Sequence, residues 1–203
     1  MQETLTQRAR NQRDTWNAIH QAAFGLASSK GPGAVTVDEI SAQAGVSRRT
    51  FFNYFPVKED AVLGTRSAEL DPAVVERFHA STEDELTRVV HLFVSVVRTC
   101  LPEETAAQRR AIIAEHPQLR ARLAELLAQV ERLVYSAVHA ETDQGGMHLP
   151  EGAGAHAFEA LLALAGGITK FAFSRYHESG AESLDPFISE TIALFRKVVE
   201  TTR

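Results

Sequence analysis

The chain of 203 residues is 44% hydrophobic and 23% charged, which indicates a soluble globular protein large enough for one small and one larger domain. Its single cysteine excludes an internal disulfide, and no apolar run approaches the ~20 residues of a membrane span, so we expect a cytoplasmic protein without a membrane partner. The formal net charge is −5. Residues 1–60 hold seven of the 21 Lys and Arg residues but only six of the 26 Asp and Glu residues, so this part is the one suited to phosphate.

Periodic apolar segments alternate with seven prolines, and no alternation of β-branched residues suggests a strand, so we expect an all-α fold. The first helix is predicted for roughly residues 4–28. Its inner stripe should consist of Trp16, Ile19, Ala23 and Leu26. Arg8, Arg10 and Arg13 stand near its start, where they either contact DNA phosphates or serve only as solubility charges.

Two short helices joined by a tight turn are predicted next. Thr36 and Glu39 have the spacing of a capping box, in which the hydroxyl and the carboxylate each cover a free backbone N–H at a helix start. The helix that begins near Val37 should end at Gly45, where a left-handed residue stops it. Ser47 is a good N-cap for the second helix.

The second helix has an aromatic inner face and a polar outer face. Phe51 and Phe55 share one side at a spacing of four residues, and Pro56 marks the end of the helix. The outer side is left to Arg48, Arg49, Asn53 and Tyr54. This order of features is typical of a helix-turn-helix whose second helix reads DNA; the alternative is a solvated charged face on an ordinary helical hairpin.

The segments TVDEISAQAGVS, RRTFFNYF and VKED resemble the N-terminal domain of TetR-type bacterial transcriptional regulators, over roughly residues 18–63. The resemblance implies a helix-turn-helix DNA-binding domain, which we place at residues 1–56. It also implies a larger helical ligand-binding and dimerisation domain, which we place at residues 57–203.

Position along the second helix assigns roles on DNA. Arg48 and Arg49 are best placed for guanine O6 and N7, and Asn53 could pair with adenine or bond a phosphate. By the resemblance, phosphates would also be bonded by Thr50, Tyr54 and Lys58. The predicted DNA-contacting residues are therefore Thr36, Ser47, Arg48, Arg49, Thr50, Phe52, Asn53, Tyr54 and Lys58.

Two residues depart from the pattern of the resembled family. Phe52 stands where the family most often has a tyrosine that contacts the DNA backbone, so it either packs inward or touches a thymine methyl group. Val57 stands where the family commonly has a serine that caps the next helix, and loss of that hydroxyl should cost about 1 kcal/mol of local helix stability.

The remaining helices are predicted at about residues 71–80, 81–99, 105–115, 119–138, 155–178 and 185–202, with a Gly-rich surface loop at 143–154. The helix that ends near Thr99 is apolar nearly all round, so it should be the central helix of the larger domain.

The last two helices carry faces suited to close packing. The first of them is rich in Ala and Gly, and the second has an apolar stripe of Ile188, Ile192, Phe195 and Val199. As in the resembled family, these helices would form a four-helix interface in a homodimer. The alternative is that both faces are used inside one monomer.

A ligand cavity is predicted between the central helix and the helices around it. Its apolar lining would be Phe93, Val97, Ile113, Leu123, Leu127, Phe158 and Leu162, and its polar groups Arg109, His116 and Arg175. The alternative is that the apolar residues are plain core. The segment EHPQLR resembles a subgroup whose ligand domain binds acyl-CoA-like molecules.

The histidines form no pattern typical of a metal site, no cofactor-binding motif is present, and no nucleophile–base pair is visible, so we expect neither metal, cofactor nor enzymatic activity. We predict a homodimeric, ligand-responsive repressor that binds a palindromic operator in the major groove and is released by a small hydrophobic effector, with acyl-CoA-like molecules as one class of candidate. The alternatives are an all-α enzyme and a DNA-binding protein that needs no effector.

Overall fold

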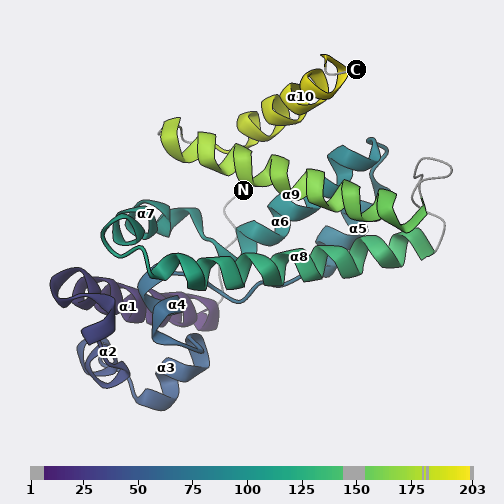
Figure 1. The fold of residues 1–203 in the computed structure, drawn as a ribbon. Helices are drawn as coiled ribbons and strands as arrows, with labels where there is room; N and C mark the ends of the chain where they lie inside the picture. Colours follow the sequence, from purple (N-terminus) through teal and green to yellow (C-terminus); the bar gives the residue numbers. More distant parts are fainter. Residues whose placement is uncertain (1–6, 144–153, 180, 182, 202–203) are drawn as a thin grey trace. The chain divides into compact units, whose positions relative to one another are not determined.

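The computed structural model describes residues 7–143, 154–179, 181 and 183–201. Within these ranges the regular structure is entirely helical, which confirms the all-α prediction (Figure 1). The helices are α1 (Gln7–Lys30), η1 (Pro32–Ala34), α2 (Val37–Ala44), α3 (Arg48–Tyr54), α4 (Lys58–Leu63), α5 (Pro72–Ala80), α6 (Glu85–Cys100), η2 (Glu103–Thr105), α7 (Ala106–Glu115), α8 (Leu119–Asp143), α9 (Gly154–Ser179) and α10 (Asp185–Thr201). The predicted loop at 143–154 lies almost wholly outside the described residues.

The chain folds into two compact units. The N-terminal unit comprises residues 1–67 and 98–127, and the C-terminal unit comprises residues 68–97 and 128–203. The N-terminal unit therefore contains not only α1 to α4 but also α7 and the first turns of α8.

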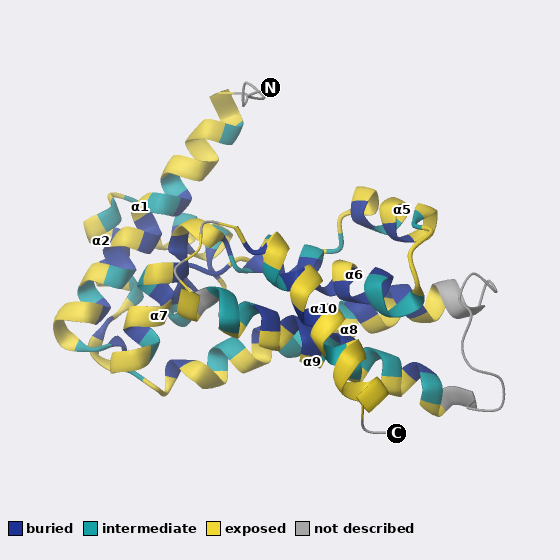
Figure 2. Ribbon diagram, turned by 90° about the horizontal axis from the view of Figure 1, so that it is seen from above, coloured by how far each residue is buried: buried dark blue, intermediate teal, exposed yellow. Residues whose placement is uncertain are grey.

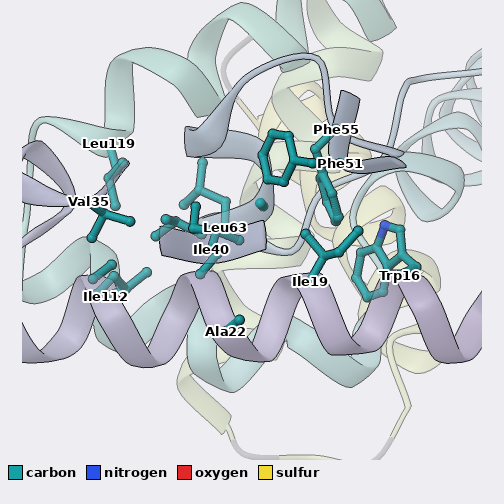
Figure 3. Packing of buried hydrophobic residues seen from close by; sticks show 14 residues of the cluster. Trp16, Ile19, Ala22, Val35, Ile40, Phe51, Phe55, Leu63, Ile112 and Leu119 are labelled. Atoms are coloured by element: carbon teal, nitrogen blue, oxygen red, sulfur yellow. The ribbon is translucent and has the colours of Figure 1, made fainter. Parts of the chain in front are cut away.

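One apolar cluster holds the N-terminal unit together. Side chains from α1, α2, α3 and α4 meet in it, and Ile112 of α7 and Leu119 of α8 complete it (Figure 3). Its largest fully buried members are Phe51, Phe55, Ile19, Ile40 and Leu63. Since each such side chain contributes roughly 1.5–3 kcal/mol on burial, this cluster is the main source of stability for the unit.

The local signals at the helix ends agree with the structure. The capping box of Thr36 and Glu39 is complete, and Gly45 ends α2 in the left-handed conformation with φ of 68°. Ser47 caps α3, whereas Val57 gives α4 no side-chain cap, as its apolar side chain requires. The first helix ends two residues later than predicted, at Lys30, and its predicted start at residue 4 lies outside the described residues.

Helix α6 is central to the C-terminal unit. Its buried residues lie along much of its length (Figure 2) and include Val89, Val90, Leu92, Phe93, Val94, Val96 and Val97. Helix α9 approaches it closely at Gly166, where an added Cβ would stand 3.7 Å from the ring of Phe93. The small residues of α9 thus serve partly to pack α9 on α6.

Helix α10 pairs with α9, and its apolar stripe is only partly covered. Ile188 and Ile192 are buried, as predicted, but Val199 is 51% exposed. The alternative that the whole stripe is used inside one monomer therefore does not hold at its end, since Val199 is not covered by the described residues of this chain, while the predicted homodimer interface stays a prediction.

Among the described residues, one helix is long and apolar enough to cross a bilayer by length and composition, namely residues 156–176 of α9. This differs from the expectation that no segment reaches that limit. Mostly buried core helices of soluble proteins meet the same criterion, but only 28% of the apolar window of this segment is buried, including Ala165, Ile168 and Ala172.

The burial of Phe55 yields a prediction about stability. Phe55→Ala should lower the free energy of unfolding of the N-terminal unit by about 3–5 kcal/mol, because it leaves a cavity in the main cluster. Urea unfolding followed by the fluorescence of Trp16, the single tryptophan, measures this loss. The matched control is Phe52→Ala, in which the ring removed is 49% exposed and the cost should be below about 0.5 kcal/mol. Equal losses in the two variants would contradict the assignment of inner and outer faces.

Candidate nucleic-acid interface

The start of α3 is fixed by Ser47. Its Oγ accepts a hydrogen bond of 3.0 Å from the backbone N–H of Thr50, and the hydroxyls of the two residues lie 2.8 Å apart. Helix α3 therefore begins at Arg48, directly after the turn that Gly45 makes possible. Two tight local constraints thus set where the second helix starts and in which direction it runs.

The rotation of α3 about its axis is fixed by two buried rings. Phe51 and Phe55 have no solvent exposure, and their centroids lie 6.0 Å apart. The ring of Phe55 packs against Trp16 of α1 at 5.5 Å, and both phenylalanines point toward α1 (Figure 3). Because these side chains occupy one side of a short helix, Phe52 and Asn53 are turned outward, whereas Tyr54, predicted for the outer face, packs partly against the same cluster.

The outward side of α3 carries two arginines in different situations. Arg48 Nη1 lies 3.0 Å from both carboxylate oxygens of Asp38 on α2, in an ion pair whose side chains are both more than half exposed. Arg49 is exposed and has no partner among the described residues. Exposed ion pairs contribute only about 0–1 kcal/mol, so a phosphate or a guanine can replace Asp38 at little cost.

The other predicted DNA contacts on α3 divide by exposure. Asn53 is exposed, while Thr50 and Tyr54 are half-buried. Phe52 is 49% exposed, so of its two predicted alternatives the structure excludes packing into the core. Its ring instead rests edge-to-face on Phe51, with centroids 5.3 Å apart.

Thr36 is committed to the capping box. Glu39 Oε2 accepts hydrogen bonds from the Thr36 backbone N–H at 2.9 Å and from the Thr36 hydroxyl at 2.8 Å. Lys30 also donates to the Glu39 carboxylate, and the bonds from Lys30 and Thr36 together lower the pKa of Glu39 to about 2. The carboxylate is therefore charged throughout the physiological range and holds the start of α2 in place.

Lys58 is occupied within the protein. Its Nζ donates to the backbone carbonyl of Val35 at 2.8 Å and lies 3.4 Å from that of Gly33. These bonds connect the start of α4 to the segment before α2. A phosphate contact from Lys58, which the resemblance implies, would have to share or replace these carbonyl bonds.

A set of buried polar residues in the N-terminal unit escaped sequence reasoning. Asp60 on α4 accepts two hydrogen bonds of 2.8 Å from Arg122 on α8. His20 on α1 lies 2.8 Å from the Ala61 carbonyl through Nδ1, which must carry the proton because a carbonyl only accepts. Nothing local marks these residues, since their partners lie 41 or more positions away in the chain.

Of the predicted ligand residues, half lie in each unit. Arg109, Ile113, His116, Leu123 and Leu127 belong to the N-terminal unit, and Phe93, Val97, Phe158, Leu162 and Arg175 belong to the C-terminal unit. The set as a whole stays a prediction.

Arg109, among the predicted ligand residues, has a structural role that the sequence did not reveal. It is buried and donates to the Thr105 hydroxyl at 2.9 Å and to the Pro102 carbonyl at 3.3 Å. Burial lowers the pKa of Arg109 to about 10, which leaves it charged at neutral pH.

A pocket of about 200 Å³ lies between α5 and α6 in the C-terminal unit. It is lined by none of the predicted ligand residues but by Val74, Arg77, Phe78, Ser81, Glu83, Arg88, His91, Leu92 and Ser95. Two of its charged groups are already paired, since His91 Nδ1 lies 3.0 Å from Glu83 and Arg88 Nη1 lies 2.9 Å from Glu85.

The described residues also bear on metal binding and on cysteine chemistry. These residues contain no cluster of three or more His, Cys, Asp or Glu able to hold a metal ion. Cys100 is buried, and burial raises the pKa of its thiol to about 11, so that it is a poor nucleophile at neutral pH.

Comparison with known proteins identifies the helix-turn-helix. Residues 19–63 match the family model of bacterial regulatory proteins of the tetR family. This segment begins inside α1 and ends with the last residue of α4. A search of curated proteins gives no match.

Several solved structures resemble the chain at low identity. FadR from Bacillus subtilis, a transcriptional regulator in complex with stearoyl-CoA, is 17% identical with a TM-score of 0.48, over 88% of this chain and 96% of that one. A protein from Mesorhizobium loti MAFF303099, described as a TetR-family transcriptional regulator, is 20% identical with a TM-score of 0.46, over 96% and 98%. FadR from Thermus thermophilus, a TetR-family repressor in complex with lauroyl-CoA, is 24% identical with a TM-score of 0.42, over 88% and 92%.

The capping box yields a prediction about pH. The Glu39 carboxyl should titrate near pH 2 in the folded protein instead of near its ordinary value of 4.5, as NMR of the carboxyl carbon can measure. Because the folded pKa is the lower one, the contribution of this group to stability is complete above about pH 4.5 and is lost as the pH falls toward 2.

Lys30→Met removes the largest cause of the shift and should raise the pKa of Glu39 toward its ordinary value. The matched control, Lys30→Arg, keeps a charged donor and should preserve most of the shift. A Glu39 titration near 4.5 in the unaltered protein would contradict the capping-box geometry.

Proposed function

We propose that this chain, a transcriptional regulator whose residues 19–63 belong to the TetR family of bacterial regulatory proteins, is a homodimeric repressor that reads a palindromic operator with α3. The observation that carries the proposal is the division of α3 into two faces. Phe51 and Phe55 are not exposed to solvent, whereas Arg49 and, one turn after it, Asn53 are both exposed. Such a helix can present Arg49 to guanine and Asn53 to adenine in the major groove, while its opposite side stays fixed in the core.

Charge in the reading region supports contact with DNA. Asp38 forms an ion pair with Arg48, and Glu39 forms one with Lys30. The two carboxylates of α2 should therefore repel DNA phosphates less than unpaired carboxylates would. The start of α1 adds Arg8, Arg10 and Arg13, all exposed, as candidates for contacts with the flanking phosphates. Thr50 and Tyr54, which are both half-buried, remain proposed phosphate ligands.

An apolar surface on the last two helices supports a homodimer. The exposed large hydrophobic residues of α9 and α10 are Phe171, Leu194, Val198 and Val199, each at least 41% exposed. The ring of Phe171 lies 5.8 Å from that of Phe195, so the two helices contribute to one continuous surface. A monomer that left this surface in water would be prone to association, whereas a symmetric copy would cover it.

The regulatory part of the proposal is a small hydrophobic effector bound by the helices of the larger domain, with acyl-CoA-like molecules as a class to test. The pocket between α5 and α6 offers apolar side chains, Phe78 and Leu92, beside the exposed Arg77. An effector can release DNA only if it binds the conformation that does not bind DNA more tightly than the one that does. A thermal shift with such compounds would separate this function from that of an effector-independent DNA-binding protein.

The DNA-reading role is tested with Arg49→Ala. Loss of a bidentate guanine contact costs about 1–3 kcal/mol, so affinity for the operator should fall about 5- to 150-fold for each half-site. Binding to random duplex should change little, and the dimer should remain intact. Fluorescence anisotropy with labelled operator and random DNA measures both affinities. The matched control is Arg132→Ala on α8, which removes an equal charge outside the helix-turn-helix. An Arg49→Ala protein that prefers the operator over random duplex as strongly as the original protein does would contradict the proposed reading face.

The dimer is tested with Leu194→Asp. A carboxylate in the middle of the apolar surface would be desolvated in the interface, so the variant should sediment as a monomer while keeping its helical circular dichroism. Analytical ultracentrifugation measures the change in mass. The matched control is Ala193→Asp, which adds the same charge to the neighbouring, also exposed position. A protein that is monomeric before substitution would contradict the proposed homodimer.

A further inference from the structure

Phe52 is an apolar ring on a polar helix face, and DNA phosphates give it no partner. It is 49% exposed, although a phenylalanine in a short helix can be buried, as its neighbours Phe51 and Phe55 show with no exposure at all. A ring has no donor for phosphate oxygens. If this ring contacts the nucleic acid, the contact must therefore be with an apolar group of the DNA.

The position of Phe52 relative to the residues proposed to contact bases restricts which group of the DNA its ring could contact. Arg49, Phe52 and Asn53 stand at i, i+3 and i+4, so their side chains share one stripe along α3. All three are exposed. If Arg49 and Asn53 reach base edges, the ring between them faces the same groove, where the C5-methyl group of thymine is the apolar feature of the bases.

The ring is also held in place. Its edge-to-face contact with Phe51, at 5.3 Å and an interplanar angle of 89°, ties it to a side chain that is itself fixed in the core. A ring that is ordered before binding loses little conformational freedom on contact with a base. This arrangement suits selection between methylated and unmethylated pyrimidines better than a freely rotating side chain would.

We propose that Phe52 is a specificity-determining residue that reads thymine in each half-site by packing its ring on the C5-methyl group. The inference rests on the proposed function, since it requires that α3 enters the major groove. It adds a third type of base to the readout, so that an operator half-site should contain a thymine next to the bases read by Arg49 and Asn53.

The experiment replaces thymine with deoxyuridine, which lacks only the methyl group. After an operator has been selected from random duplex DNA, each thymine is replaced in turn, and the affinity of the full-length protein is measured by fluorescence anisotropy. At one thymine position of the half-site, replacement in a single half-site should lower the affinity of the protein about fourfold, which corresponds to about 0.8 kcal/mol for one buried methyl group. Replacement in both half-sites should cost about 15-fold.

Phe52→Ala assigns the effect to the ring. The variant should bind the thymine operator more weakly and should no longer distinguish thymine from deoxyuridine at that position. Asn53→Ala is the matched control, because it should weaken binding and yet keep the discrimination. Since Phe52 is outside the core, circular dichroism should show both variants folded.

The outcomes separate the inference from the proposed function. If no operator is selected, the proposed function fails. If an operator is selected but every deoxyuridine replacement leaves affinity unchanged, or if Phe52→Ala still discriminates, the role of Phe52 is refuted while DNA reading by α3 stands. The role of Phe52 is likewise refuted if Phe52→Ala lowers the affinity for thymine and deoxyuridine operators equally and the original protein does not discriminate between the two operators either.

Discussion

The contact of Phe51 and Phe55 with α1 is the constraint on which the other features of the N-terminal unit depend. Two rings without solvent exposure, packed among Trp16 and Ile19, allow α3 only one rotation about its axis. A helix of seven residues such as α3 has little stability of its own, so this packing, together with the Ser47 cap, replaces the stability that length would give. The exposed arrangement of Arg49, Phe52 and Asn53 is the direct consequence.

The N-terminal unit extends beyond the helix-turn-helix through polar contacts as well as apolar ones. Asp60 of α4 is bound by Arg122 of α8, and the Thr105 hydroxyl before α7 donates to the Gly64 carbonyl at 3.0 Å. Gly64 has φ of +60°, and a Cβ there would stand 2.7 Å from His20 and 2.9 Å from Thr105. The end of α4 is thus closely fitted to α1 and to the segment before α7.

How far the sequence predicts the structure depends on how local the cause is. The capping box of Thr36 and Glu39, the left-handed Gly45 and the inward Phe51 and Phe55 all follow from spacing over three or four residues, and the structure confirms them. The pairing of Asp60 with Arg122 and the pairing of Arg48 with Asp38 depend on which helices meet, and spacing within a helix carries no information about that. For the same reason Lys58, with its bonds to the carbonyls of Gly33 and Val35, proved to have a partner inside the protein.

The predicted ligand-binding residues show the same limit of prediction from local sequence patterns. An apolar residue on a helix can line a cavity or fill a core, and the periodicity is identical in both cases. Phe93 and Phe158 are buried in the C-terminal unit, and Ile113 packs on the cluster of the N-terminal unit. The pocket between α5 and α6 arises instead from polar and apolar residues of two helices whose pairing the sequence did not specify.

The most direct measurement of the central claim is selection of bound duplexes from a random DNA pool by the full-length protein. If the outer face of α3 reads bases from a symmetric dimer, the recovered sequences should converge on two inverted half-sites whose centres are separated by about one helical turn or a multiple of it. Recovered sequences without any shared half-site would contradict the account, because they would show that the exposed face of α3 does not discriminate between bases.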